Sequence, residues 1–184
     1  MKRNLGIIKY RQAIRALMLI CIPCILFCGA CGTQHPSEVK PPAKEKDLVP
    51  VNRFLVKKNE QNIENFIARK GWTMHQTPTG LWYMIYEKGK GEAGSKGKTI
   101  SFTYNSYLLD GSRCYSSDSL GVKSFKIGNG KVESGLEEAA LLLHNGDRAR
   151  LILPPHLAFG LLGDNNKIPP QSPLLYDLYI TDLK

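Results

Sequence analysis

The clearest hydrophobic pattern in this chain spans residues 134–145, SGLEEAALLLHN. Its apolar residues recur every three or four positions, as along one face of a helix: Leu136, Ala139, Ala140 and Leu143, with Leu141 and Leu142 widening that face. Ser134 and Glu137 form a capping-box pattern at its start, and Asn145-Gly146 provides a left-handed stop at its end. The pattern predicts a short helix that other elements must cover, because so much of its surface is apolar.

Segments before this helix carry the patterns of β-strands. Residues 81–86, LWYMIY, are rich in β-forming side chains. Residues 99–109 alternate, with Ile100, Phe102 and Tyr104 on one side and Thr99, Ser101 and Thr103 on the other. Asp110-Gly111 then supplies a hairpin turn. These features predict an α+β fold in which a curved antiparallel sheet wraps around the short central helix.

A second, amphipathic helix is predicted from Asn52 to Lys70, and Gly71 stops it. Its apolar face consists of Val56, Ile63, Phe66 and Ile67, while charged and amide side chains fall outside that face. Two interpretations remain open from the sequence. The helix packs on the neighbouring domain, or it serves as an arm for dimerisation or for binding client polypeptides.

The first 30 residues have the organisation of a secretory signal. They contain five Lys or Arg and no acidic residue, and they end in an almost wholly apolar run from Ala16 to Ala30. The following residues up to Pro50 hold several prolines among polar side chains, which predicts a tether at 31–50. Such a tether spans roughly 25 Å as a flexible coil and about 60 Å as extended polyproline, enough to hold a domain away from a lipid surface.

The cysteines support a processing signal and not a disulfide framework. Four of the five lie in or just after the apolar run, which leaves Cys114 alone in the rest of the chain. Gly29-Ala30-Cys31 resembles the end of a bacterial lipobox, so we expect Cys31 to be lipidated. Cys28 stands where a lipobox has an aliphatic residue, and a plain signal peptide or a retained membrane anchor is the alternative.

Charge and histidine spacing narrow the possible functions. The formal net charge of +9 falls to +4 once the first 30 residues are left out, and the remainder has no cluster of arginines. Nucleic-acid binding needs a concentrated basic face, so no nucleic-acid partner is expected. The three histidines of this remainder that lie beyond the tether, His75, His144 and His156, lack the spacing of metal ligands, and no metal site is predicted.

Ordered groups of residues resemble the FKBP-type peptidyl-prolyl isomerases. They are Tyr104, Leu109-Asp110-Gly111, Ser116-Ser117, Phe125–Gly128, Gly135–Glu138, Gly146, Leu157–Gly160 and Ile168–Pro170. The resemblance covers about residues 81–183 and implies a five- or six-stranded antiparallel sheet around the 134–145 helix, with a substrate pocket between helix and sheet. The N-terminal features add a resemblance to FKBP lipoproteins of Bacteroides-like bacteria, some of which are named for gliding motility.

The resemblance implies rotation about X-Pro peptide bonds, a reaction that needs no cofactor and no metal. It also implies ten pocket residues: Tyr104, Cys114, Tyr115, Phe125, Val132, Glu133, Leu136, Phe159, Ile168 and Tyr176. Several of these depart from the family pattern. Leu136 replaces a tryptophan, Phe159 replaces a tyrosine, and Cys114-Tyr115 replaces a Phe-Asp pair. Glu133 places a charge where the family has an aliphatic residue whose backbone N–H binds substrate.

Two functions therefore remain open. The first is a prolyl isomerase that assists the folding of exported proteins, lipid-anchored to a bacterial membrane and facing the periplasm, with proline-containing polypeptides as clients. The second is a catalytically weak or inactive FKBP-like binding module or chaperone. In both, the chain divides into a lipoprotein signal peptide at 1–30, the tether at 31–50, an amphipathic helix and turn at 51–80, and an FKBP-type domain at 81–184.

Overall fold

The computed structural model describes residues 45–184, and the side chains from Pro50 onward. The predicted signal peptide, Cys31 and most of the predicted tether therefore lie outside the described residues. The helices are α2 (Glu45–Lys70), α3 (Ser117–Leu120), α4 (Ser134–Ala140) and the single 3₁₀ turn η1 (Pro155–Leu157). The strands are β1 (His75–Gln76), β2 (Trp82–Glu87), β3 (Thr99–Leu108), β4 (Arg113–Ser116), β5 (Lys123–Lys126), β6 (Arg148–Leu153) and β7 (Leu174–Leu183).

The seven strands form one antiparallel sheet with the order β1-β2-β6-β7-β3-β4, and β5 pairs with β3. Its centre is the long β3–β7 ladder, in which Tyr104 lies opposite Leu178 and Ser106 opposite Tyr176. Asp110-Gly111 closes the β3–β4 hairpin, where the Leu108 N–H donates to the Ser112 carbonyl at 2.9 Å and Gly111 has a φ of +96°. The predicted α+β fold is confirmed, with one strand more than expected because the two-residue β1 joins the edge.

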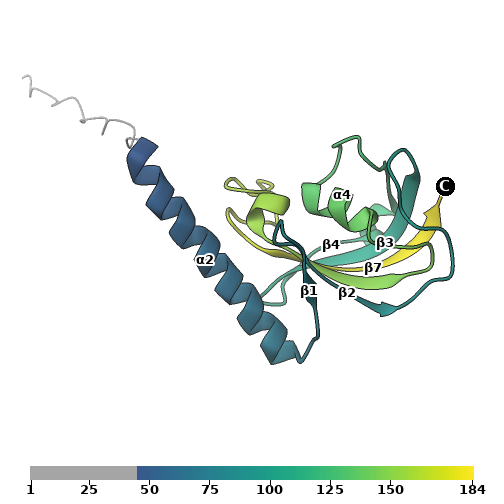
Figure 1. Cartoon of the computed structure of the whole chain (residues 1–184), viewed down its shortest axis with the longest axis horizontal. Coiled ribbons are helices and arrows are strands. Elements are labelled where there is room, and N and C mark those ends of the chain that lie inside the picture. Colours follow the sequence, from purple (N-terminus) through teal and green to yellow (C-terminus); the bar gives the residue numbers. More distant parts are fainter. Residues whose placement is uncertain (1–44) are drawn as a thin grey trace, which may run out of the picture. The chain divides into compact units, whose positions relative to one another are not determined.

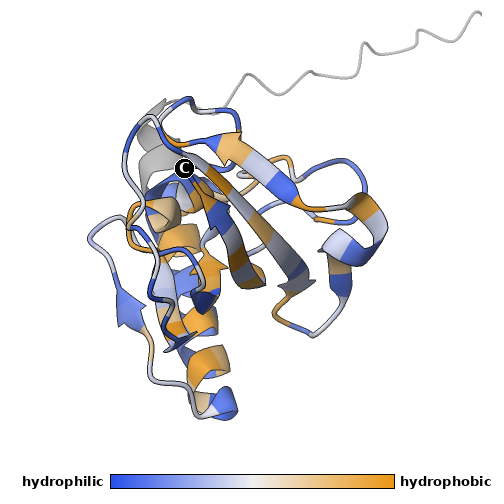
Figure 2. Ribbon diagram, turned by 90° about the vertical axis from the view of Figure 1, so that its right-hand side faces the viewer, coloured by the Kyte–Doolittle hydropathy of each residue, from blue (hydrophilic) through white to orange (hydrophobic). Residues whose placement is uncertain are grey.

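Helices lie on both faces of the sheet (Figure 1). The short helix α4 covers the inner face, where Leu136, Ala139 and Ala140 pack against Leu151 and other buried strand residues. Bands of hydrophobic and hydrophilic residues alternate along the strands in Figure 2, as expected when successive side chains point to opposite faces. The main core therefore lies between α4 and the sheet.

The C-terminal half of α2 packs against the opposite face. Ile63, Phe66 and Ile67 are buried in a second cluster with Ile152 of β6 and Leu175 of β7. This confirms the interpretation that the helix packs on the following domain. Val56 was predicted on the same apolar face, but it is 56% exposed because the sheet does not extend as far as the first turns of the helix.

The start of α2 also differs from expectation. The helix begins at Glu45 and contains Pro50, whereas the tether was predicted to continue through Pro50. A proline already has a helical φ, but inside a helix it removes a backbone donor and its ring crowds the carbonyl four residues before it. Pro50 is exposed, so water can satisfy the carbonyl that this donor would have met. No helix among residues 45–184 combines the length and the hydrophobicity needed to cross a bilayer.

The capping box predicted at Ser134 is wrong. The N-cap of α4 is Glu133, and no side chain caps that end of the helix. The Glu137 carboxylate instead accepts the backbone N–H groups of Gly128 and Gly130, at 2.6 and 2.8 Å. The helix also ends earlier than predicted, at Ala140, and the chain continues as a turn that buries Leu143. The Glu137 carboxylate that a capping box would use thus binds the backbone of the preceding loop instead.

Candidate functional site

The ten predicted pocket residues come from five helices and strands and from two loops. Tyr104 lies on β3, Cys114 and Tyr115 on β4, Phe125 on β5, Leu136 on α4 and Tyr176 on β7, and the others lie in the loops before α4 and after η1. Nine of them belong to or pack against the main core cluster: Tyr104, Cys114, Tyr115, Phe125, Val132, Leu136, Phe159, Ile168 and Tyr176. Glu133 joins them through a hydrogen bond to Tyr176.

Aromatic rings line one side of this site. The ring centroids of Tyr104 and Tyr176 lie 5.7 Å apart, with the planes tilted by 50°. Phe102 packs edge-on against both Tyr104 and Phe125, at 6.0 and 6.2 Å. Such contacts fix the orientation of neighbouring rings and contribute about 0.5–1.5 kcal/mol per pair. The site therefore has a rigid, largely apolar wall.

Glu133 places a carboxylate in this wall. The Tyr176 hydroxyl donates to its Oε1 at 2.9 Å, and Lys123 Nζ lies 2.8 Å from its Oε2. The Glu133 side chain is only 9% exposed, so these partners compensate a charge that burial would otherwise penalise. Burial, and then the nearby Glu133 charge, raise the pKa of Tyr176 far above its ordinary value. The Tyr176 hydroxyl therefore stays protonated and remains a donor.

A second polar contact joins β4 to the loop that carries Phe159 and Ile168. The Tyr115 hydroxyl donates to Asp164 Oδ2, and the N–H groups of Asn166 and Ile168 donate to Oδ1 at 2.9 and 2.7 Å. Burial opposes ionisation of Asp164, but these hydrogen bonds outweigh it and lower the pKa of the carboxyl group. Asp164 thus holds the loop in place and accepts the hydrogen bond that the Tyr115 hydroxyl could otherwise donate to a ligand.

Several hydrogen-bond donors of the site have no partner among the described residues. They include the backbone N–H of Glu133 and the hydroxyl of Tyr104. Burial, and then the Glu133 charge, raise the pKa of Tyr104 above its ordinary value, so its hydroxyl also keeps its proton. Both donors are free to meet a carbonyl oxygen of a bound polypeptide.

Cys114 lies in the core and forms no disulfide. Burial raises the pKa of its thiol, which disfavours the reactive thiolate. Its environment is that of a small buried hydrophobic residue. Within residues 45–184, no group of three or more His, Cys, Asp or Glu side chains is arranged to hold a metal ion.

Sequence reasoning missed two residues that shape the site. Lys123 lies on the strand β5, ten positions before the carboxylate that it contacts, and nothing local distinguishes it from the other lysines. Asp164 had a weak signal. It begins the run Asp164-Asn165-Asn166, and such residues often accept backbone N–H groups a few positions ahead, as Asp164 does.

Comparison with known proteins agrees with this arrangement. The family model of the FKBP-type peptidyl-prolyl cis-trans isomerases matches residues 90–181, which is half of the chain. FkpA of Escherichia coli K12, an FKBP-type isomerase, is 34% identical over 128 residues, which cover 69% of this chain and 46% of FkpA. FK506-binding protein 2 of Yarrowia lipolytica is 38% identical over 82 residues, 44% of this chain and 57% of that protein. The chain thus spans about half the length of these curated relatives.

Solved structures give the same result. The crystal structure of FkpA from Escherichia coli superposes with a TM-score of 0.61 at 27% identity, covering 99% of this chain and 73% of that one. The crystal structure of AtFKBP13 gives a TM-score of 0.59 at 29% identity and covers 61% of this chain and 100% of that one.

Proposed function

The chain belongs to the FKBP-type peptidyl-prolyl cis-trans isomerase family, and we propose that it catalyses cis–trans isomerisation of X-Pro bonds in polypeptide substrates. The observation that supports this proposal is that nine of the ten predicted pocket residues lie in or against one core cluster and Glu133 bonds Tyr176 of that cluster, with free donors that include the Glu133 N–H and the Tyr104 hydroxyl. Free donors beside an apolar wall suit a segment of polypeptide chain that contains proline.

The reaction is a rotation and breaks no bond. The planar amide is stabilised by resonance, and uncatalysed X-Pro exchange takes tens to hundreds of seconds. As the bond twists, the amide loses resonance and its carbonyl becomes less polar. An apolar wall built from Tyr104, Phe125 and Tyr176 favours that twisted state over the planar amide, which water solvates better. In this proposal the aromatic wall supplies most of the rate enhancement.

The free donors orient the substrate. The Glu133 N–H lies at the entrance to α4 and donates to a substrate carbonyl next to the prolyl ring. Its position is fixed because the Glu133 carbonyl accepts the Leu136 and Glu137 N–H groups, at 2.9 and 3.2 Å, and its carboxylate binds Tyr176. The Tyr104 hydroxyl provides a second donor, in a site where Phe159 has no hydroxyl to offer.

A binding module without turnover is the second candidate, and the Tyr115–Asp164 contact favours it. This hydrogen bond occupies the Tyr115 hydroxyl and holds β4 against the loop that carries Phe159 and Ile168. A site held in this way can bind a polypeptide while restricting rotation within it. A folding helper or assembly partner would need nothing more.

We also propose that the domain works outside the cytoplasm, held to a bacterial membrane by a lipid on Cys31. The basic and then apolar residues 1–30 and the sequence Gly29-Ala30-Cys31 support this location. Residues 31–44 would separate the domain from the lipid surface. Its clients would then be exported polypeptides that fold near that surface.

A protease-coupled assay with a short X-Pro peptide tests the proposed activity. Wild-type protein should accelerate the slow cis-to-trans phase in proportion to its concentration. A Phe125→Ala variant, which opens the aromatic wall, should lose most of that acceleration, and its circular dichroism spectrum checks that it is folded. If the wild type binds the peptide without accelerating exchange, the binding module becomes the better function.

A further inference from the structure

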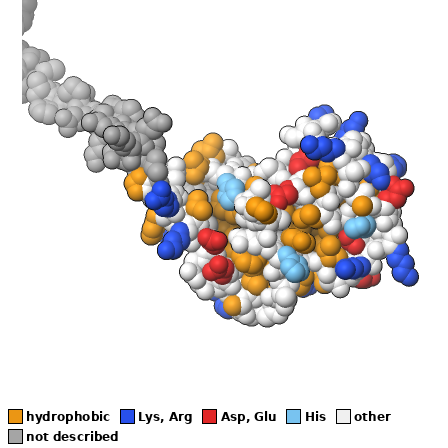
Figure 3. Space-filling model, in the orientation of Figure 1, with side chains coloured by type: hydrophobic (Ala, Val, Ile, Leu, Met, Phe, Trp, Pro, Cys, Tyr) orange, Lys and Arg blue, Asp and Glu red, His pale blue; other side chains and the backbone are white. Residues whose placement is uncertain are grey.

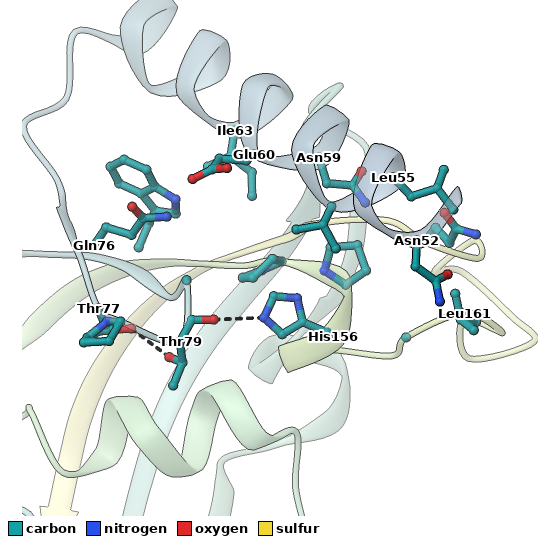
Figure 4. Close-up of a pocket in the computed structure, with 18 residues that line it drawn as sticks. Asn52, Leu55, Asn59, Glu60, Ile63, Gln76, Thr77, Thr79, His156 and Leu161 are labelled. Atoms are coloured by element: carbon teal, nitrogen blue, oxygen red, sulfur yellow. Dashed lines mark hydrogen bonds between the residues drawn. The ribbon is translucent and has the colours of Figure 1, made fainter. Parts of the chain in front are cut away.

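The structure contains a groove that is lined by none of the ten predicted pocket residues. It has a volume of about 740 Å³ and lies between the middle of α2, residues 52–63, and the loops at the end of the sheet (Figure 4). Its lining consists of Asn52, Leu55, Val56, Asn59, Glu60 and Ile63 from α2, residues 76–80, Trp82, Pro154–His156, Gly160, Leu161 and Gln171. A volume of this size falls in the range of about 300–1,000 Å³ found for sites that bury drug-sized ligands.

The groove is apolar and almost free of charge. Leu55, Ile63 and Trp82 are among its apolar lining residues, and hydrophobic side chains gather between the helix and the domain in Figure 3. Among the described residues of the lining, only Glu60 and His156 are ionisable, and the imidazole of His156 already contacts the Thr79 carbonyl at 2.9 Å. Because these described residues include no lysine or arginine, they offer nothing to a nucleic acid or to anionic lipid headgroups.

Carboxamide side chains distinguish this groove from a simple hydrophobic gap. The lining contains Asn52, Asn59, Gln76 and Gln171, and none of these side chains has a hydrogen-bond partner among residues 50–184. Each carboxamide offers both donors and an acceptor, as a peptide group does. Free carboxamides beside apolar lining residues therefore match the needs of a polypeptide, whose backbone is polar and whose side chains can be apolar.

A free sheet edge lies beside the groove. Strand β1 pairs only with β2, and Gln76 at the end of β1 lines the groove. Unpaired backbone groups at a sheet edge can bind an added extended strand. This second feature also favours an extended polypeptide over a compact small molecule.

One loop connects the groove to the prolyl site. Phe159 packs against the main core beside the predicted pocket, while the next residues, Gly160 and Leu161, line the groove. A polypeptide bound in the groove therefore lies close to the prolyl site along the same loop.

From these features we propose that the groove is a second polypeptide-binding site, which holds an extended, uncharged and largely apolar stretch of an unfolded client. This proposal extends the proposed function, because the held stretch and the isomerised proline belong to the same client. It does not require a proline in the groove. The groove keeps the client bound while successive X-Pro bonds reach the prolyl site.

Matched exposed residues allow a direct test. Val56 and Leu161 line the groove and are 56% and 66% exposed, so Val56→Glu and Leu161→Glu introduce a charge into it without disturbing the core. Phe54→Glu and Leu162→Glu are the controls, because these residues lie on the same helix and loop, are 66% and 78% exposed, and do not line the groove. The probe is a fluorescent, uncharged, apolar peptide without proline, measured by anisotropy.

We expect wild-type protein and both controls to bind this peptide alike, and both groove variants to bind at least about tenfold more weakly. Turnover of a short X-Pro peptide should stay within about twofold of wild type in all four variants, because the prolyl site is untouched. Equal weakening in controls and groove variants, or no binding by the wild type, overturns the proposal. So does sedimentation that shows a dimer dissociated only by the groove variants, since a second copy would then be the occupant. If the wild-type protein binds the proline-free peptide but does not turn over the X-Pro peptide, the isomerase function is refuted and the binding site in the groove is not.

Discussion

The hydroxyl of Tyr176 on β7 donates a hydrogen bond across 2.9 Å to the carboxylate of Glu133 at the start of α4. Lys123 of β5 binds the same carboxylate, at 2.8 Å. The Glu133 charge is therefore compensated by side chains from two strands, Lys123 of β5 and Tyr176 of β7. The Tyr176–Glu133 pair links the start of α4 to the sheet.

Removing that hydroxyl should destabilise the fold. Tyr176→Phe leaves the nearly buried carboxylate with Lys123 as its remaining side-chain partner, and a hydrogen bond to a charged group contributes about 1.5–3 kcal/mol. We expect a loss of this size in the free energy of unfolding by urea. Tyr104→Phe is the control, since its hydroxyl has no partner, and it should change stability by less than about 0.5 kcal/mol. Equal effects of the two variants would contradict the assigned contact.

Single substitutions can add a hydroxyl donor to the pocket or remove one from it. Phe159→Tyr adds a hydroxyl that can bond a substrate carbonyl, and about 0.5–1.5 kcal/mol corresponds to a two- to tenfold gain in kcat/KM. Tyr104→Phe removes a free hydroxyl and should lower kcat/KM by a similar factor. A decrease in KM with kcat unchanged would mean that the new bond forms equally in the ground and transition states.

Phe54→Tyr on the exposed face of α2 serves as the control for Phe159→Tyr, because it adds the same hydroxyl away from the pocket. If neither Phe159→Tyr nor Tyr104→Phe changes binding or rate, substrate carbonyls do not reach this side of the pocket. The binding module would then be the better function.

The start of α4 should depend on Glu137 and not on Ser134. Glu137→Ala removes the acceptor of the Gly128 and Gly130 N–H groups and is expected to cost about 1–2 kcal/mol of stability. Ser134→Ala should stay within about 0.5 kcal/mol of wild type, because its side chain caps nothing. Chemical denaturation of both variants decides the point, and a larger loss for Ser134→Ala would restore the capping box.

Asp164 should contribute a pH-dependent part of the stability. Its pKa is lowered in the folded state, so its contribution is fully present above the unfolded pKa of about 3.9 and is lost as pH falls through the folded value. Asp164→Asn should therefore be less stable than wild type at neutral pH, and the difference should shrink below about pH 4. The exposed Asp118→Asn is the control. A difference that stays constant down to pH 2 would mean that the charge of Asp164 does not contribute.

Membrane attachment depends on Cys31, which lies outside the described residues. We expect mass spectrometry of the mature protein to find an acylated Cys31 as its first residue. Cys31→Ala should prevent acylation and release the domain from membranes, whereas Cys28→Ala should leave both unchanged. A soluble mature wild-type protein would support a plain signal peptide instead.

Local patterns were sufficient for much of the fold. Alternation along residues 99–109 identified β3, the Asp110-Gly111 pair identified its hairpin, and the apolar spacing in 134–145 located α4. These features depend on interactions between residues a few positions apart, so the sequence alone determines them. The order of family-like residues along the chain then predicted ten pocket residues; nine of them lie in or against one core cluster, and Glu133 bonds Tyr176 of that cluster, while their role in binding stays a prediction.

Only the tertiary structure decided how the polar groups pair. Glu133 meets Lys123 across ten positions and Tyr176 across 43, and Tyr115 meets Asp164 across 49. Glu137 accepts N–H groups from the loop just before α4 in place of the capping-box partner, and Val56 fits the helical pattern but is exposed. Such choices depend on which strands the chain path places side by side. Spacing along the sequence carries no information about them, and the same is true of the groove between α2 and the domain.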